Sequence, residues 1–142
     1  MSGLSAAINA AASALNVERT RIEVAVSNIA NAESTRGPDG QPYRRRDVVL
    51  ASDPVKSFDA ALGEANATGV KVAAIVQDQA SFRRRYEPSH PDADADGFVS
   101  LPNVDAPQEM VDMLGAARAY QANLAAIGLI KEMVSRALEL GR

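Results

Sequence analysis

Three aspartates and a glycine form the cluster in this sequence whose residue types and spacing suggest ion chemistry. Residues 92–97 read Asp-Ala-Asp-Ala-Asp-Gly, which matches positions one, three, five and six of a calcium-binding loop. The twelfth position is Asn103, which cannot supply the bidentate carboxylate, and Pro88 and Pro91 prevent a normal entering helix. We therefore expect an acidic turn here, with a calcium site as the alternative.

Catalytic chemistry finds no comparable cluster. The single histidine, His90, lies between Ser89 and Pro91 with no evident nucleophile or carboxylate arrangement. The sequence contains no P-loop, dinucleotide-binding glycine motif or Gly-x-Ser-x-Gly elbow. Because it has no cysteine, it can form neither a disulfide framework nor a thiolate metal site. We expect a protein that is not an enzyme, has no catalytic residues and needs no cofactor or metal.

Two arginine triplets, 44–46 and 83–85, stand out in a chain whose formal net charge is −3. Both fall in strand candidates, where we expect solvated edge charges that block aggregation. Pairing with acidic groups of neighbouring subunits is the second interpretation. The acidic balance and the aromatic content of 4% argue against nucleic acid as a partner.

The elements that position these residues are dominated by two expected helices, at 2–30 and from 105 onward. Steps averaging about 3.5 residues keep one apolar seam against a neighbouring helix. The N-terminal stripe consists of Leu4, Ile8, Ala11, Leu15, Ile22, Ala25 and Ile29. The C-terminal stripe consists of Met113, Ala117, Tyr120, Leu124, Ile127, Val134 and Leu138. We expect the two stripes to form the seams through which the helices pair as a coiled coil.

Capping residues define the second helix, and turn formers define the middle of the chain. Asp105 can cap the helix with Gln108 three residues on, Pro107 fits the first turn, and Gly141 supplies the stop. The expected strands are 43–51, 70–77, 81–86 and 98–101. The sequence thus predicts a mainly α protein with a small β part: a helix and turn at 1–35, a short β-rich middle domain at 36–104, and a helix at 105–142.

The energetics of the ends predict dependence on neighbours. The larger apolar side chains of one stripe contribute roughly 10–20 kcal/mol, whereas ordering each residue costs ~1–2 kcal/mol before hydrogen bonding. We expect both ends to be frayed in the monomer and to order when they pack. The longest apolar run is seven residues, too short to cross a membrane, and we expect no cleavable targeting signal.

Several segments resemble the bacterial flagellar rod and hook protein family. They are Ser-Asn-Ile-Ala-Asn-Ala at 27–32, Gly-Pro-Asp-Gly-Gln-Pro-Tyr at 37–43, Gly-Phe-Val at 97–99 with Leu-Pro-Asn-Val-Asp at 101–105, and Ala-Arg-Ala-Tyr-Gln-Ala-Asn at 117–123. The resemblance covers essentially the whole chain in order. The second and third segments, and the short middle domain, are most similar to the proximal-rod members.

This resemblance implies a structural subunit of the proximal rod, the drive shaft that crosses the periplasm in the flagellar basal body. It implies export through the flagellar type III apparatus without a cleaved signal peptide, and no direct membrane insertion. The implied partners are other proximal and distal rod proteins, proteins at the junction of the MS ring and export gate, and the export apparatus itself. The competing hypothesis is a small calcium-responsive binding module with helical-hairpin ends.

Four polar residues belong to the segments that carry the resemblance: Asn28, Asn31, Gln121 and Asn123. For Asn28 and Asn31 we weigh a helix C-cap and turn against a subunit contact. We expect Tyr120 to pack within the chain, and Gln121 and Asn123 to face adjacent subunits.

Overall fold

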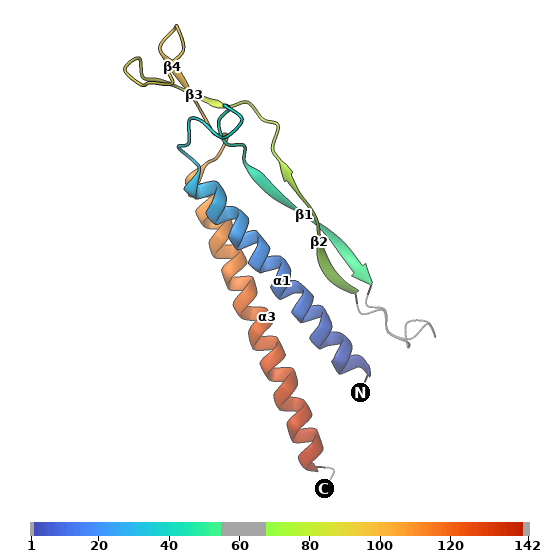
Figure 1. The fold of residues 1–142 in the computed structure, drawn as a ribbon. Helices are drawn as coiled ribbons and strands as arrows, with labels where there is room; N and C mark the ends of the chain where they lie inside the picture. Colours follow the sequence, from blue (N-terminus) through green and yellow to red (C-terminus); the bar gives the residue numbers. More distant parts are fainter. Residues whose placement is uncertain (1, 55–67, 141–142) are drawn as a thin grey trace.

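Two long helices form the shaft of the molecule. The computed structural model describes residues 2–54 and 68–140. Helix α1 spans Ser2–Ala30 and helix α3 spans Ala106–Leu140. They lie side by side and antiparallel, and the C-terminal end of α3 extends beyond the start of α1 (Figure 1). Both helices and the start of α3 directly after Asp105 agree with the sequence prediction, whereas the stop expected at Gly141 lies outside the described residues.

A long antiparallel hairpin runs along α1. Strand β1, Arg46–Pro54, pairs with strand β2, Thr68–Gln77, with one register shift between Val49 and Leu50. Ser13 on α1 accepts a hydrogen bond from the Val70 amide (3.1 Å). The hairpin approaches α1 so closely that a Cβ on Gly69 would lie 2.9 Å from the Ser13 Oγ. Helix α1 therefore lies between the hairpin and α3, and contacts both (Figure 1).

A second, shorter hairpin forms the tip of the molecule beyond the ends of the helices (Figure 1). Strand β3, Arg83–Tyr86, pairs antiparallel with strand β4, Phe98–Leu101. The Tyr86 and Phe98 rings meet edge to face with centroids 5.3 Å apart. Gly97 has a φ of 82°, and a Cβ there would lie 2.9 Å from the Tyr86 ring, so this turn requires glycine.

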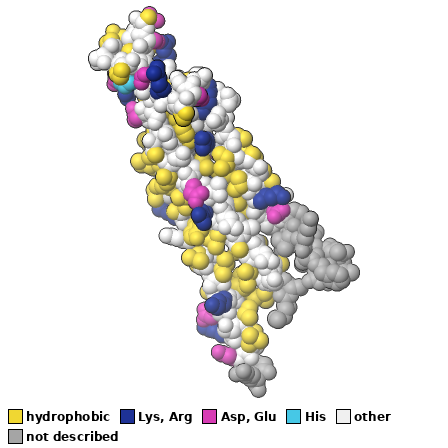
Figure 2. All heavy atoms as spheres, viewed as in Figure 1, with side chains coloured by type: hydrophobic (Ala, Val, Ile, Leu, Met, Phe, Trp, Pro, Cys, Tyr) yellow, Lys and Arg dark blue, Asp and Glu magenta, His cyan; other side chains and the backbone are white. Residues whose placement is uncertain are grey.

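The best-buried side chains gather where the helices meet the tip. We call this region the junction: residues 28–46, where α1 ends and β1 begins, and residues 97–109, where the chain enters α3. Its fully buried side chains are Asn28, Val99, Pro102 and Val104. Along the helical shaft the buried apolar residues are the small or medium side chains of Val17, Ala25 and Ala116. Figure 2 shows apolar side chains on much of the visible surface of the shaft.

The predicted stripe of α1 is mostly half-buried in this chain. Ile8, Leu15, Ile22 and Ile29 are half-buried, and Leu4, near the start of the helix, is exposed. Ser13 and Val17, which lie toward the hairpin, are on roughly the opposite side of the helix from Leu15 at 3.6 residues per turn. This arrangement places the predicted stripe of α1 on the side away from the hairpin.

Two residues of the predicted α3 stripe do not lie between the helices of this chain. Leu124 is 54% exposed and Leu138 is 65% exposed, so their predicted role in a seam would have to involve neighbouring subunits. The covered face instead follows steps of three and four through Met113, Ala116, Tyr120, Asn123, Ile127, Ile130 and Val134. Leu124 lies one residue away from this face, and the Leu138 turn lies on the part of α3 that α1 does not reach (Figure 1).

The strands begin and end close to the predicted positions. Strand β1, at Arg46–Pro54, starts and ends three residues later than expected. Strand β2, at Thr68–Gln77, starts two residues earlier than expected, and β4 matches the prediction at both ends. Among the described helices, none combines the length and the apolar character that crossing a bilayer requires.

Candidate functional site

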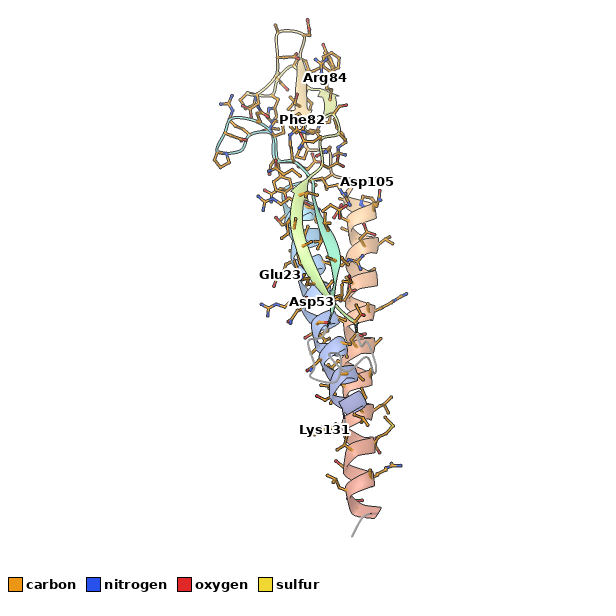
Figure 3. The ribbon with its side chains drawn as sticks, turned by 90° about the vertical axis from the view of Figure 1, so that its right-hand side faces the viewer. Glu23, Asp53, Phe82, Arg84, Asp105 and Lys131 are labelled. Carbon is orange, nitrogen blue, oxygen red and sulfur yellow. The ribbon has the colours of Figure 1, made fainter. Side chains whose placement is uncertain are left out.

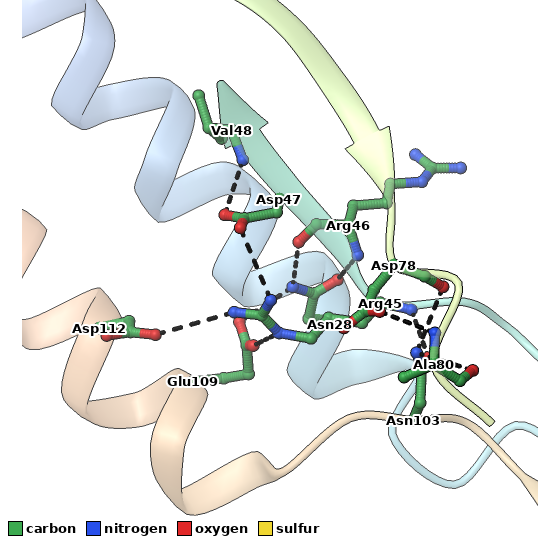
Figure 4. Close-up of polar contacts among 10 residues, drawn as sticks. All are labelled: Asn28, Arg45, Arg46, Asp47, Val48, Asp78, Ala80, Asn103, Glu109 and Asp112. Atoms are coloured by element: carbon green, nitrogen blue, oxygen red, sulfur yellow. Dashed lines mark hydrogen bonds and ion pairs between the residues drawn. The ribbon is translucent and has the colours of Figure 1, made fainter. Parts of the chain in front are cut away.

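Asn28 is the centre of a buried polar network that joins three parts of the chain (Figure 4). Its side chain is 1% exposed near the end of α1. The amide oxygen accepts hydrogen bonds from the Arg46 amide (3.0 Å) and the Tyr43 hydroxyl (2.9 Å), and the amide nitrogen donates to the Arg46 carbonyl (2.9 Å). The same nitrogen donates to the Glu109 carboxylate on α3 (2.9 Å). One asparagine thus links α1, the start of β1 and the start of α3.

Glu109 and Arg45 complete the charged part of this network. Glu109 is 3% exposed in the first turn of α3, and its second carboxylate oxygen accepts a hydrogen bond from Arg45 Nε at 2.6 Å. The Arg45 guanidinium also lies 3.8 Å from the Asp47 carboxylate and 4.0 Å from that of Asp112. A buried carboxylate is costly without partners, and here Asn28 and Arg45 supply them.

Burial and charge act in opposite directions on Arg45. Desolvation lowers the pKa of its guanidinium, but the hydrogen bond and the charge of Glu109, together with Asp47 and Asp78, raise that pKa above its ordinary value. Arg45 is therefore positively charged at neutral pH. We call Asn28, Tyr43, Arg45 and Glu109 the polar node.

Asn103 ties the segment before α3 to the same strand. Its side-chain oxygen accepts a hydrogen bond from the Arg45 amide (2.9 Å), and its amide nitrogen donates to the Asp78 carbonyl (3.3 Å). The Asp78 amide in turn donates to the Arg45 carbonyl (2.8 Å). Figure 4 shows these bonds beside the polar node. Among the described residues, every buried side-chain nitrogen and oxygen has a hydrogen-bond partner.

The tip hairpin is held to the end of α1 by arginines. Arg83 donates to the Ala32 carbonyl (3.2 Å) and the Pro102 carbonyl (2.9 Å). Arg85 forms an ion pair with Glu33 at 2.8 Å. All three arginines of this triplet are exposed on a strand of a two-stranded hairpin, as expected for solvated edge charges, and they also pair with groups of neighbouring segments.

The first triplet is also engaged within the chain. Arg44 lies over the Phe82 ring at 4.4 Å and donates to the Asp78 carbonyl (3.3 Å), and Arg45 belongs to the polar node. Arg46 lies over the Tyr43 ring at 5.6 Å. Figure 3 shows the side chains crowded at this end, with Phe82 and Arg84 labelled in the tip and Asp105 at the start of α3.

The aspartates at 92–96 form a turn that uses its carboxylates for local contacts. Asp94 accepts hydrogen bonds from the Phe98 amide (2.8 Å) and the Asp96 amide (3.0 Å), and pairs with Arg84 at 2.6 Å. Asp92 accepts a hydrogen bond from the Thr35 hydroxyl (2.8 Å). Asn103 is committed to the strand contacts above. These carboxylates point to separate partners, and the described residues contain no cluster of three potential metal ligands.

The predicted signature residues have different surroundings. Of the two interpretations weighed for Asn28, a subunit contact does not fit its surroundings, because its side chain is buried in the polar node. Asn31 donates to the Ser27 carbonyl (2.8 Å), which is the predicted helix C-cap and turn. On α3, Tyr120 and Asn123 are half-buried and Gln121 is exposed. The intersubunit roles of Gln121 and Asn123 stay predictions.

Sequence reasoning missed the partners of Asn28. Glu109 falls in step with Met113, Ala116 and Tyr120, so a carboxylate stands in register with the buried face of α3. A charge at such a position needs a buried partner, and this signal could have identified it. No comparable signal exists for Tyr43, because its contact depends on the path of the segment between α1 and β1.

The depression beside the polar node is small and mostly polar. It has a volume of about 200 Å³ and is lined by residues of α1, the start of β1 and the first two turns of α3. Sites for small molecules are usually about 300–1,000 Å³ and mostly apolar. The node is therefore suited to holding three elements in register.

Known proteins match both ends of this chain. The family model described as "Flagella basal body rod protein" matches residues 8–38, and the model described as "Flagellar basal body rod FlgEFG protein C-terminal" matches residues 95–140. Residues 8–38 include Asn28, and residues 95–140 include Glu109.

Curated relatives match nearly the whole length. The flagellar basal-body rod protein FlgC of Salmonella typhimurium is 47% identical over 132 residues, which cover 93% of each chain. The FlgC protein of Bacillus subtilis is 43% identical over 145 residues, covering 95% of this chain and 96% of the relative. That of Borreliella burgdorferi is 39% identical over 152 residues, covering 97% of both.

Proposed function

Because this chain belongs to the FlgC family of flagellar basal-body rod proteins, we propose that it is a subunit of the proximal rod that polymerises through its terminal helices. Its role is structural. The observation that carries the polymerisation is the incomplete burial of the shaft: Leu114, Leu124, Leu129 and Met133 are all more than half exposed along α3. A single chain leaves these side chains in water, and an assembly of helices would cover them.

The expected mechanism is the transmission of torque through packed helices. Well-packed interfaces deform little because their side chains interdigitate at high density. The polar node supports this role, since its bonds hold α1, the start of β1 and the start of α3 in fixed positions. No step of this mechanism requires a catalytic residue.

The location and the partners follow from the same proposal. The chain would be exported through the flagellar type III apparatus without a cleaved signal peptide and would occupy the part of the basal body that spans the periplasm. Its neighbours would be other proximal and distal rod proteins, with proteins of the MS-ring and export-gate junction at one end. The calcium-responsive module gains no support from the carboxylates of the acidic turn, which bind their own loop and neighbouring side chains.

Mass spectrometry of purified hook–basal bodies from the source organism tests the proposal. The chain should be present and should remain after filament and hook have been removed. Its absence from otherwise intact basal bodies would overturn the assignment to the rod.

A pair of variants tests the role of the helical seam. Leu15→Asp places a charge on the half-buried stripe of α1, and we expect it to abolish incorporation into basal bodies. Asn16→Asp introduces the same group one residue away at an exposed position and should incorporate normally. Equal incorporation of both variants would show that the seam is not needed for assembly.

A further inference from the structure

Helix α3 is apolar around most of its circumference, although α1 covers one face only. Its large exposed apolar residues are Met110, Val111, Leu114, Leu124, Leu129, Met133 and Leu138. A helix that is apolar on all sides is normally buried on all sides. The distribution of apolar and charged residues on the uncovered surface indicates which partner would cover it.

Successive residues of a helix are separated by about 100°, which sorts the uncovered surface into two flanks and a ridge. The first flank is formed by Met110, Ala117, Leu124 and Gly128. The second flank is formed by Val111, Gly115, Ala122, Leu129 and Met133. Between them runs a mainly polar ridge of Arg118, Gln121, Glu132, Arg136 and Glu139, which is preceded by the exposed Leu114. The second flank contains no charged residue, and the first flank contains one, Lys131, seven residues after Leu124.

The charges on the ridge are sorted by sign. Glu132 and Glu139 lie on the edge of the ridge next to the first flank, and Arg118 and Arg136 lie on the edge next to the second flank. Glu132 and Arg136 also pair across the ridge within the helix. If the first flank of one helix met the second flank of another, an acidic edge would face a basic edge. If two like flanks met, charges of one sign would face each other.

We propose that the first flank of one copy packs against the second flank of a second copy of this chain. This inference rests on the proposed function and adds to it the surfaces that neighbouring copies use. Because the two flanks point in different directions, the contact is heterologous, and one kind of contact repeated from copy to copy covers both flanks. The charged part of the ridge, from Arg118 to Glu139, stays in contact with water.

The glycines of the two flanks support a close helix–helix contact. A Cβ added at Gly115 or at Gly128 would meet no atom within 4 Å in this chain. Packing within the chain therefore does not require glycine at either position, although glycine is unfavourable inside a helix. Small residues at both flanks allow the backbone of a second helix to approach.

Cysteine cross-linking tests the proposal, because the natural chain contains no cysteine. The variant Leu124→Cys marks the first flank, and Ala122→Cys, Leu129→Cys and Met133→Cys mark three heights on the second flank. Each would be the only copy of the chain in motile cells, and basal bodies would be oxidised and analysed without reductant. Incorporation is measured separately on samples that have not been oxidised.

Double variants that combine Leu124→Cys with a second-flank cysteine should give a ladder of dimers, trimers and longer products of this chain for at least one height. Each single variant should give none. Self-cross-linking of Leu124→Cys would indicate contact between like flanks and would overturn the proposal. A product that contains a chain of another mass would place a different rod protein on the flank and would also overturn the proposal.

Controls separate this inference from the proposed function. Gln121→Cys on the polar ridge should incorporate, form no cross-link and stay reactive to maleimide in the assembled rod. If Leu124→Cys fails to incorporate, Gly128→Cys marks the same flank. Incorporated double variants that give no product at any height would overturn the flank contact while leaving the rod assignment intact. Absence of the natural chain from basal bodies would instead overturn the rod assignment.

Discussion

The junction and the helical shaft are stabilised in different ways. At the junction, Asn28, Val99, Pro102 and Val104 are fully buried, and hydrogen bonds connect α1, β1 and α3. Along the shaft, the seam residues are mostly half-buried, and the outer side of α3 exposes Val111 (68%) and Leu129 (62%) to solvent. The junction satisfies its own polar and apolar groups, whereas the shaft leaves much apolar surface uncovered.

This difference suits a subunit whose elements must be correctly positioned before assembly and whose helices must be rigid after it. A buried network of directional bonds sets the positions of the elements within one chain, because each polar group has a definite partner. Uncovered apolar surface does not by itself set the positions of the elements, but it stabilises the assembly when neighbouring helices cover it. The comparison therefore predicts a monomer that is well ordered at one end only.

Amide hydrogen exchange in the dilute monomer gives the largest expected contrast. Amides near Asn28, Val99 and Val104 should be protected roughly a hundredfold or more over those in the last turns of α3, because local opening at an uncovered helix end costs little free energy. Exchange followed by mass spectrometry or NMR provides the measurement. Strong protection along both helices would show that the shaft is stable without neighbours and would remove the contrast.

Removing the centre of the polar node should cause the largest loss of stability by a single substitution. Asn28→Ala deletes the bonds to Arg46, Tyr43 and Glu109 and leaves buried groups without partners, at a cost of roughly 2–4 kcal/mol in the free energy of unfolding. Urea unfolding followed by circular dichroism measures this loss. Asn31→Ala, which removes a local bond to Ser27, is the matched control and should cost less than about 1 kcal/mol.

If the two asparagine variants were equally stable, the buried network would contribute no more to the free energy of unfolding than the local bond of Asn31 at the end of α1. The junction would then owe its order to apolar packing alone. The next pair of variants measures that packing directly.

The same truncation at two valines compares the apolar parts of the two regions. Val104 is fully buried at the junction, so Val104→Ala should cost about 1.5–2.5 kcal/mol. Val134 is half-buried near the end of α3, and Val134→Ala should cost less than about 1 kcal/mol in the monomer. Similar losses for the two variants, measured by urea unfolding, would contradict the difference in burial.

The sequence predicted the shaft better than the junction, for a physical reason. The helices follow from local periodicity, and both were placed correctly from the stripes and from Asp105 at the start of α3. The stripe alone did not settle which side of α3 faces α1. Two faces of the helix fit helical spacing equally well: one runs through Met113, Ala116, Tyr120 and Asn123, and the other through Met113, Ala117 and Leu124.

The contacts of the junction depend on residues far apart in the chain. Asn28 and Glu109 are separated by 81 positions, and Arg45 meets Glu109 across 64. Propensity and spacing describe near neighbours only, so the motif identified Asn28 while neither of the two interpretations weighed for it included Glu109. The acidic turn shows the same limit, since its spacing matches a calcium loop while Arg84 and backbone amides occupy the carboxylate of Asp94.

The smallest expected effect concerns the exposed tip, where a titration can show whether charge contributes to local order. The Phe98 amide, with further help from Arg84 and the Asp96 amide, holds the pKa of Asp94 below its ordinary value, although desolvation acts in the opposite direction. A carboxyl whose pKa is lower in the folded state stabilises that state above its unfolded pKa of about 3.9, and this contribution is lost as the pH falls through the folded pKa. Carboxyl ¹³C NMR should therefore give a pKa below about 3.9 for Asp94, and Arg84→Gln should raise it only part of the way because the Phe98 amide remains. A midpoint at or above the ordinary value would mean that the turn is held by its backbone and by the Tyr86–Phe98 contact, without a contribution from the ionised carboxylate.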